Sequence, residues 1–260
     1  MNNHVSILGC GEIGETILLG AINGGLDKNQ ISVSAHSEKR VNYLIEKYGV
    51  DGSTDSNIAM KNTDIVILSV PYTAVDDVLN KIVPDMQPNT IIVSLIAELS
   101  LNDIQAKIPN HSAIVRAMPS IGSRVGFGLT LLSFGNNILD TQINNVEAFF
   151  SLFGKNIVVS DEQQHNMAPL SSSGLSYVLY MTDALIEGNA VRGISRDVSL
   201  QMMQNILSAA SALLDQKNGQ NIADLLHSMC SPGGTGIKRI ANLDRKGVKS
   251  AFMDAISEDI

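Results

Sequence analysis

The sequence predicts an α/β fold in which a doubly wound parallel sheet comes first and a wholly helical region follows. Short apolar segments alternate with helical patterns over the first 160 residues. The first of these segments leads into the glycine pattern Gly-x-Gly-x-x-Gly at residues 9–14. After about residue 161 the strand signals end and long helical patterns take over. Strands that alternate with helices favour right-handed crossovers, so this order indicates a Rossmann-type sheet.

The individual elements follow from their hydrophobic periodicity. The third strand is a near-continuous apolar run, which suits a strand buried on both faces, and the helices place apolar residues three or four positions apart. Strands are expected at residues 5–8, 31–34, 64–70, 90–95, 113–117, 129–133 and 156–159. Helices are expected at 13–23, 38–48, 75–82, 101–107, 144–153, 173–188, 195–216, 222–229 and 236–260, the last broken near Gly247. We therefore expect a dinucleotide-type domain over 1–160 and a helical domain over 161–260, with a ligand cleft between them.

Composition excludes several classes of function. The chain has 260 residues, of which 44% are hydrophobic and 17% charged, and its net charge is −8. This acidic charge argues against nucleic-acid binding in bulk, since phosphate binding favours a basic face, although it leaves a local basic pocket open. No apolar run is long enough to span a membrane. Cys10 and Cys230 are too far apart in the sequence to suggest a disulfide framework, so a reducing, cytoplasmic location is expected. The five histidines lack metal-ligand spacing, so no metal site is expected.

The glycine pattern after the first strand is typical of a turn that binds a dinucleotide. Gly9 permits the tight turn, Gly11 leaves room for a pyrophosphate, and Gly14 lets the helix pack close to the sheet. The N–H groups of the helix N-terminus favour phosphate. Glu12 and Ile13 occupy the remaining loop positions. Because a carboxylate repels phosphate, the side chain of Glu12 is expected to point outward.

The end of the second strand indicates which dinucleotide is bound. NAD sites usually place an acidic residue there, but this chain continues His36-Ser37-Glu38-Lys39-Arg40. Ser37 can bond a 2′-phosphate, Lys39 and Arg40 are candidate charge partners, and His36 can contact the adenine or the phosphate. The pattern favours NADP(H) over NAD(H). For Lys39 or Arg40 taken alone, a solvated helix face is at least as good an interpretation.

Short motifs along nearly the whole chain resemble the pyrroline-5-carboxylate reductase family. They are Asn57, Ile67-Leu68-Ser69-Val70-Pro71, Ser94-Leu95-Ile96-Ala97, Arg116-Ala117-Met118-Pro119, residues 171–177 and Ser231-Pro232-Gly233-Gly234-Thr235. The last motif is the most specific. The resemblance implies the fold described above and a homodimer, or a larger assembly of dimers, paired through the helical half. The apolar residues of that half, which exceed a single helix stripe, agree with pairing.

The resemblance also implies a reaction, in which NADPH gives a hydride to the C=N carbon of a cyclic imino acid. The named substrate would be 1-pyrroline-5-carboxylate and the product L-proline. The cofactor would contact the glycine loop, His36, Ser37, Arg40, Asn57, Ser69, Val70, Pro71, Ala97, Met118 and Pro119. The substrate carboxylate would lie at helix starts formed by Ser173, Gly174, Ser231, Gly234 and Thr235. A protonated imine is already electrophilic, so alignment and desolvation are the main tasks of the protein.

The chain departs from the family pattern around this cleft. Gly236 stands where the family has a hydroxyl residue, Leu175 replaces a helix-starting proline, and Ser120-Ile121-Gly122 replaces Asn-Thr-Pro. The last variant resembles late-competence-type relatives. Three functions stay open: reduction of pyrroline-5-carboxylate, reduction of another imine, and noncatalytic nucleotide binding with a regulatory role. The first is preferred, because a lost hydrogen bond costs only about 0.5–1.5 kcal/mol.

Overall fold

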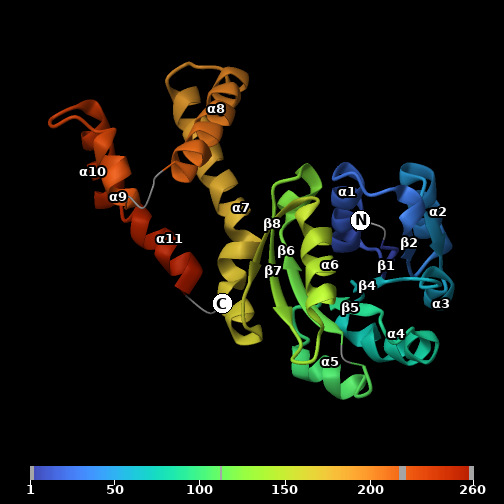
Figure 1. The fold of residues 1–260 in the computed structure, drawn as a ribbon. Coiled ribbons are helices and arrows are strands. Elements are labelled where there is room, and N and C mark those ends of the chain that lie inside the picture. The colour runs from blue at the N-terminus through green and yellow to red at the C-terminus, as the bar shows by residue number, and fades with distance from the viewer. Residues whose placement is uncertain (1–2, 112, 217–220, 258–260) are drawn as a thin grey trace. The chain divides into compact units, whose positions relative to one another are not determined.

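The computed structural model describes residues 3–111, 113–216 and 221–257 (Figure 1). Its contacts divide the chain into two compact units, Met1–Gly174 and Leu175–Ile260. The division falls within helix α7 (Asp161–Val191). The domain boundary expected at residue 160 stays a prediction.

The first unit contains an eight-stranded sheet with the order β3-β2-β1-β4-β5-β6-β7-β8. All neighbouring strands run parallel except β6 and β7, which are antiparallel. The strands are β1 (Val5–Leu8), β2 (Ile31–Ser34), β3 (Asp51–Ser53), β4 (Ile65–Leu68), β5 (Ile91–Ser94), β6 (Ile114–Pro119), β7 (Gly128–Phe134) and β8 (Gly154–Val158). The fold class predicted from the sequence is confirmed, with β7 reversed because segment 120–127 is too short for a parallel crossover.

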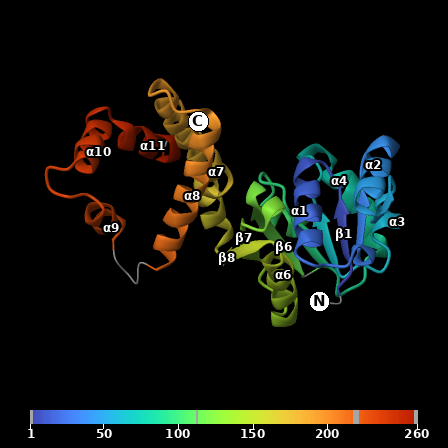
Figure 2. The same cartoon turned by 90° about the horizontal axis from the view of Figure 1, so that it is seen from above.

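Helices cover both faces of this sheet (Figure 2). One core contains Ile7 and Ile67 and lies under α1 (Glu12–Asn23), α2 (Glu38–Tyr48) and α6 (Asp140–Ser151). The other contains their neighbours Leu8 and Leu68 and lies under α3 (Ser56–Ala59), α4 (Val75–Ile82) and α5 (Leu101–Lys107). Successive strand residues point to opposite faces, which explains why the buried strands read as unbroken apolar runs. Short 3₁₀ helices are η1 (Lys28–Gln30), η2 (Tyr72–Ala74), η3 (Val83–Asp85) and η4 (Ile121–Val125).

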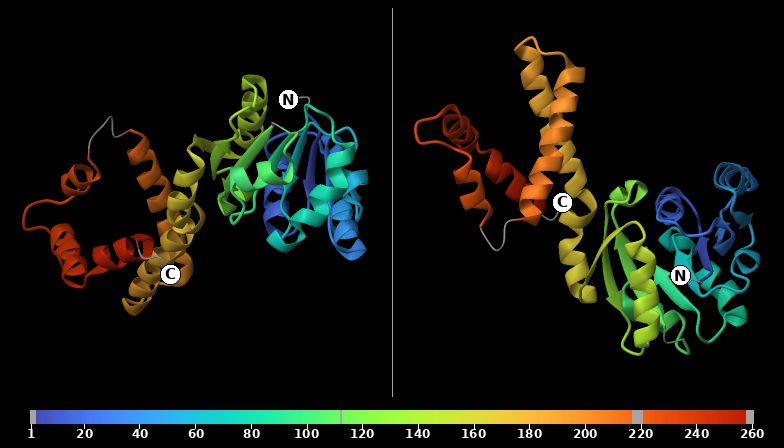
Figure 3. Two further views of the ribbon diagram at one scale, coloured as in Figure 1. Left: turned by 90° about the horizontal axis from the view of Figure 1, so that it is seen from below. Right: turned by 45° about the horizontal axis from the view of Figure 1, so that its top comes forward.

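The second unit is wholly helical, as the sequence predicts. After the end of α7, α8 turns back alongside it (Figure 3), and an ion pair of 2.5 Å joins Arg196 Nη1 to Glu187 Oε1. The helices are α8 (Arg196–Asp215), α9 (Ile222–Ser228), α10 (Thr235–Arg245) and α11 (Val248–Ser257). Gly247, with φ of 70°, separates the last two, so the expected break is confirmed. Among the described residues of this unit, only Thr182, Ser199 and Met203 are buried.

Helix α7 begins well before the helix start expected at residue 173. Ser160 caps it, because Ser160 Oγ accepts from Gln163 N at 3.1 Å while Gln163 Oε1 accepts from Ser160 N at 3.0 Å. Pro169 lies inside the helix and does not end it. The expectation that Ser173 and Gly174 start a helix is therefore wrong: both lie in a helix interior, where backbone N–H groups bond within the helix.

Candidate functional site

The glycine loop between β1 and α1 is shaped by contacts that leave no room for side chains at two of its three glycines. Gly9 has φ of 78°, and a Cβ there would lie 2.3 Å from Val70 Cγ1. A Cβ on Gly14 would lie 2.6 Å from Ser69 Oγ. At Gly11 the nearest atom would be the carbonyl oxygen of Gly9, 3.8 Å away. The expected packing roles of Gly9 and Gly14 are confirmed, and Gly11 leaves open space beside the backbone.

Neighbouring strand ends hold this loop in place. Ser69 Oγ donates to the carbonyl oxygen of Gly9 at 2.9 Å, and Cys10 N donates to the carbonyl oxygen of Ser34 at 2.6 Å. The carboxyl ends of β1, β2 and β4 therefore meet at the loop. Strands β2 and β3 lie on one side of β1, and the strands from β4 onward lie on its other side. Ligands of such sheets bind at this switch point between β1 and β4.

The residues after β2 lie at the same edge of the sheet. His36 and Ser37 are exposed, and Ser37 Oγ caps α2 by accepting from Arg40 N at 3.3 Å. Lys39 is exposed on α2. Arg40 instead reaches back to the loop: its Nε donates to the carbonyl oxygen of Cys10 and its Nη2 to that of Gly11, both at 3.0 Å.

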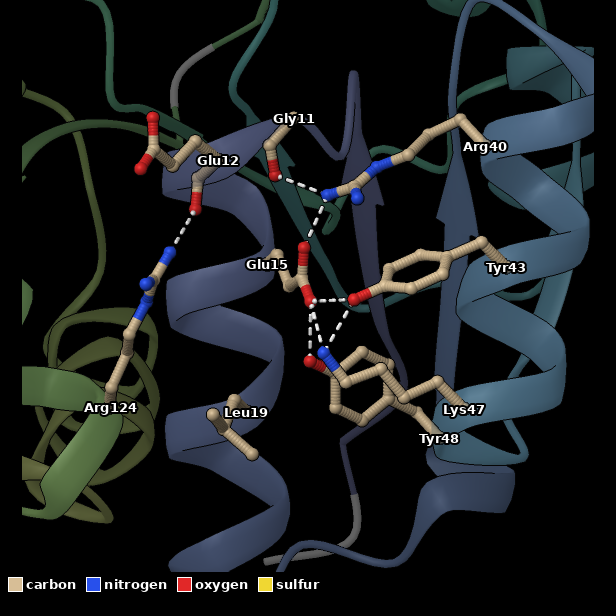
Figure 4. Close-up of a pocket in the computed structure, with 9 residues that line it drawn as sticks. All are labelled: Gly11, Glu12, Glu15, Leu19, Arg40, Tyr43, Lys47, Tyr48 and Arg124. Atoms are coloured by element: carbon tan, nitrogen blue, oxygen red, sulfur yellow. Dashed lines mark hydrogen bonds and ion pairs between the residues drawn. The ribbon is translucent and has the colours of Figure 1, made fainter.

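A cluster centred on Glu15 joins α1 to α2 and lines a pocket of about 440 Å³ (Figure 4). The Glu15 carboxylate accepts from Arg40 Nη2 at 2.6 Å, Lys47 Nζ at 3.0 Å, Tyr43 Oη at 3.1 Å and Tyr48 Oη at 2.5 Å. Burial opposes ionisation of Glu15, but the donors Tyr48, Lys47 and Arg40 outweigh it and lower its pKa to about 2. We call these five residues the Glu15 cluster. No sequence pattern marks it, because its members come from two helices.

The other loop residues differ in exposure. Glu12 is exposed, and its carboxylate is turned away from the Glu15 cluster (Figure 4). Ile13 is also exposed. Burial raises the pKa of the Cys10 thiol to about 12, although Arg40 lowers it in part. A fully buried, protonated thiol is a poor nucleophile, so Cys10 serves as packing.

The remaining candidate cofactor residues lie in α3, just after β4, after β5 and at the end of β6. Ser69 and Val70 are partly buried, Pro71 and Ala97 are exposed, Met118 is partly buried and Pro119 is buried. Asn57 lies in α3, and its side-chain amide donates to Asp85 Oδ2 at 3.2 Å. That bond engages the amide with η3, whereas Ser69 contacts the glycine loop directly.

A buried ion pair fixes the loop after β5 and the start of α7. Arg116 is 5% exposed, and its Nη1 lies 2.8 Å from Asp161 Oδ1, while its Nη2 donates to the carbonyl oxygen of Ala97. Asp161 Oδ2 accepts from Leu101 N at 3.0 Å. Gln164 Nε2 donates to the carbonyl oxygen of Arg116 at 3.2 Å. A charged residue inside an apolar strand is the one sequence signal of this pair; its partner could not be found without the fold.

The candidate substrate residues fall in both units. Ser173 and Gly174 belong to the first unit, inside α7. In the second unit, Gly234 is the N-cap of α10 and Thr235 its first residue, and Gly234 N donates to the carbonyl oxygen of Ser231 at 3.0 Å. The helix start expected there is confirmed. A seat made by all five residues together stays a prediction.

The fold, the glycine turn and the strand ends at the switch point define a dinucleotide-binding protein of the Rossmann class. Among the described residues, no helix combines the length and apolar character needed to cross a bilayer. The same residues contain no group of three or more His, Cys, Asp or Glu side chains that could hold a metal ion.

Comparison with known proteins narrows this class. Residues 161–260 match the family model described as pyrroline-5-carboxylate reductase dimerisation, and residues 4–98 match that of coenzyme F420-dependent NADP oxidoreductase. The chain is 29% identical over 258 residues to the pyrroline-5-carboxylate reductase of Synechocystis sp., covering 98% of this chain and 95% of the relative. It is 28% identical over 253 residues to that of Glycine max, covering 97% and 92%.

Solved structures agree with these relatives. A pyrroline-5-carboxylate reductase from Coxiella burnetii matches with a TM-score of 0.86 and 28% identity, covering 99% of this chain and 96% of that one. The enzyme from Plasmodium falciparum, solved with NADP bound, matches with a TM-score of 0.86 at 20% identity and covers 98% and 94%, which supports the fold. Over nearly its whole length the chain is similar to pyrroline-5-carboxylate reductases, and its residues 161–260 match their dimerisation family.

Proposed function

We propose that this protein is an NADP-dependent oxidoreductase that reduces the C=N bond of 1-pyrroline-5-carboxylate to give L-proline. The observation that carries the proposal is the open glycine turn at the switch point of a chain that resembles named reductases over nearly its whole length. NADP(H) is the cofactor, and NAD(H) is the weaker candidate. The NADP-bound Plasmodium relative supports this preference, as does the absence of an acidic residue directly after β2.

The described residues fit a dinucleotide. Apart from its chain neighbours, no described residue has an atom closer than 3.8 Å to a Cβ built on Gly11, so a pyrophosphate can approach the backbone there. We assign the pyrophosphate to the loop of Gly9, Gly11, Glu12, Ile13 and Gly14. The adenosine end is assigned to His36, Ser37 and Asn57, and the nicotinamide end to Ser69, Val70, Pro71, Ala97, Met118 and Pro119. Arg40, the remaining cofactor residue expected from the sequence, bonds to the backbone of the glycine loop.

The chemistry requires little from acidic or basic side chains. When bound, NADPH supplies the hydride, and a protonated imine accepts it without further activation. The residues of this chain would orient the two reactants and exclude water. We assign the substrate carboxylate to Ser231, Gly234 and Thr235, at the start of α10. Ser173 and Gly174 are assigned to it by the family resemblance alone, since their N–H groups lie in the interior of α7. The first turn of α10, which begins at Thr235, presents the N–H groups that attract an anion.

We further propose a homodimer formed through the helical domain, residues 161–260, which the dimerisation family model spans. Large apolar side chains are exposed there, including Leu179 at 57% and Leu185 at 50%. Single exposed apolar residues are ordinary, but this many exposed apolar side chains on one domain indicate a surface that another protein subunit covers. Sedimentation of the protein and of Leu179→Glu tests this: the wild type should sediment as a dimer or larger, and a monomeric wild type would contradict it. A cytoplasmic location remains part of the proposal.

Reduction of a different cyclic imine is the second candidate. Gly236 and Ser120-Ile121-Gly122 depart from the family pattern, which changes contacts expected at the substrate. A lost polar contact would weaken binding of one ring and leave room for another. A noncatalytic nucleotide-binding role is the third candidate, and it shares every cofactor residue.

One assay separates these functions. NADPH oxidation is followed with pyrroline-5-carboxylate, with its six-membered-ring analogue, and with NADH in place of NADPH. The proposal expects turnover that is fastest with the five-membered ring and NADPH. Preference for the six-membered ring would favour the second candidate. Tight NADPH binding without turnover on either ring would favour the third.

A further inference from the structure

The guanidinium of Arg40 donates hydrogen bonds to the backbone of the glycine loop. Its Nε and Nη2 donate to the carbonyl oxygens of Cys10 and Gly11, both at 3.0 Å. Nη2 also lies 2.6 Å from Glu15 Oε2. Two loop carbonyls and one carboxylate therefore fix the plane of the guanidinium, which is a rigid fork of donors.

The Glu15 cluster keeps Arg40 in this orientation. Arg40, Tyr43 and Lys47 lie three or four positions apart, so they share one face of α2. All three, with Tyr48, donate to the same carboxylate on α1. The guanidinium is thereby held against α1, at the side of the loop that lines the pocket (Figure 4).

The orientation of a loop carbonyl decides where the next N–H points. In a trans peptide the C=O and N–H bonds are antiparallel. The peptide that joins Gly11 to Glu12 therefore directs its N–H away from Arg40 when its oxygen accepts from Arg40. That N–H belongs to the first turn of α1, the group that binds phosphate in a glycine turn of this kind.

A second arginine supports the same turn from the opposite side of α1 (Figure 4). Arg124 Nε donates to Thr16 Oγ1 at 2.8 Å, and its Nη2 donates to the carbonyl oxygen of Glu12 at 3.4 Å. The backbone of the first turn is thus held by cations from η4 and from α2.

We propose that Arg40 is a positioning residue for the dinucleotide, acting through the carbonyl groups of the glycine loop and not by contact with a 2′-phosphate. The proposal rests on the proposed function, and it makes a prediction that a direct phosphate contact does not. If Arg40 only orients the loop, its loss weakens NADPH and NADH equally, since both carry the pyrophosphate. If it binds the 2′-phosphate, its loss weakens NADPH alone.

The test compares Arg40→Met with Lys81→Met, which removes the same charge from an exposed site on α4. Dissociation constants for NADPH and NADH are measured by fluorescence titration, together with the melting temperature. Arg40→Met should raise both constants by the same factor, about tenfold, as expected for one lost charge-assisted hydrogen bond. Lys81→Met should leave both constants unchanged.

Several results would overturn the proposal. A selective loss of NADPH affinity would identify a 2′-phosphate contact, and unchanged constants with a lower melting temperature would identify a purely structural role. Glu15→Gln provides a second variant should Arg40→Met fail to fold; it should raise both constants in parallel by a smaller factor. Tighter NADPH binding in Glu15→Gln would mean that Glu15 competes with phosphate for Arg40, against the proposal. A wild type that binds neither dinucleotide would refute the proposed function itself.

Discussion

Replacing Asp161 with alanine leaves Arg116 as a buried cation without its carboxylate. The side chain of Arg116 is 6% exposed and that of Asp161 is 25% exposed. Removing one partner of a buried pair costs about 3–5 kcal/mol. Because water reaches Asp161 in part, the lower end applies, so we expect a loss of about 3 kcal/mol that includes the bond from Leu101 N. A unit of this size loses about 2–4 °C per kcal/mol, so its melting temperature should fall by about 6–12 °C.

Thermal unfolding followed by circular dichroism measures this change, with Glu162→Ala as the matched control. Glu162 is an exposed acid in the same first turn of α7, and its loss should cost less than about 0.5 kcal/mol. Replacing both partners, Arg116→Met with Asp161→Leu, should restore part of the loss, because no charge is then left uncompensated. If Asp161→Ala unfolds at the same temperature as Glu162→Ala, the reasoning is refuted.

Three further predictions concern the sites described above. Gly11→Ala should weaken NADPH binding at least about tenfold with little change in stability. Gly14→Ala should instead lower the free energy of unfolding by about 1–3 kcal/mol, since its Cβ would lie 2.6 Å from Ser69 Oγ. NADPH titration and thermal unfolding of both variants check this, and the reverse pattern would contradict it. Because the pKa of Glu15 falls from 4.5 to about 2 on folding, its stabilising effect is fully present above pH 4.5 and is lost as the pH falls toward 2. Urea unfolding against pH should therefore show a smaller acid loss in Glu15→Gln, and parallel curves would count against the cluster. Gly236→Ser should lower the KM for the imine up to about tenfold without changing the KM for NADPH, since among the described residues a Cβ there meets only Cys230 Sγ, at 3.5 Å. An unchanged KM for the imine would show that position 236 does not face the imine.

The sequence predicts elements whose side chains decide their structure. The apolar run that becomes β4 and the glycine turn after β1 are of this kind, because burial on two faces and close packing leave visible patterns. Strand β3 has the sequence Asp51-Gly52-Ser53 and pairs with β2 through its backbone, so no hydrophobic pattern marks it. Helix α7 begins before the helix start expected at residue 173, because the cap at Ser160 determines where the helix begins and Pro169 does not end it.

The candidate site likewise contains some residues that the sequence predicts and others that depend on the fold. The glycines were found by their spacing, which local backbone geometry requires. Arg40 was found as a cation near a phosphate, but its bonds to Cys10 and Gly11 depend on how α2 packs beside α1. Asp161 gave no sequence signal, because its partner Arg116 lies on a strand remote in sequence.

The amount of L-proline formed per NADPH consumed, when the purified protein is given pyrroline-5-carboxylate, tests whether this protein reduces that imine to proline. We expect one L-proline for each NADPH, because each hydride reduces one C=N bond. NADPH consumption without proline, or no consumption in a protein that binds NADPH, would contradict it.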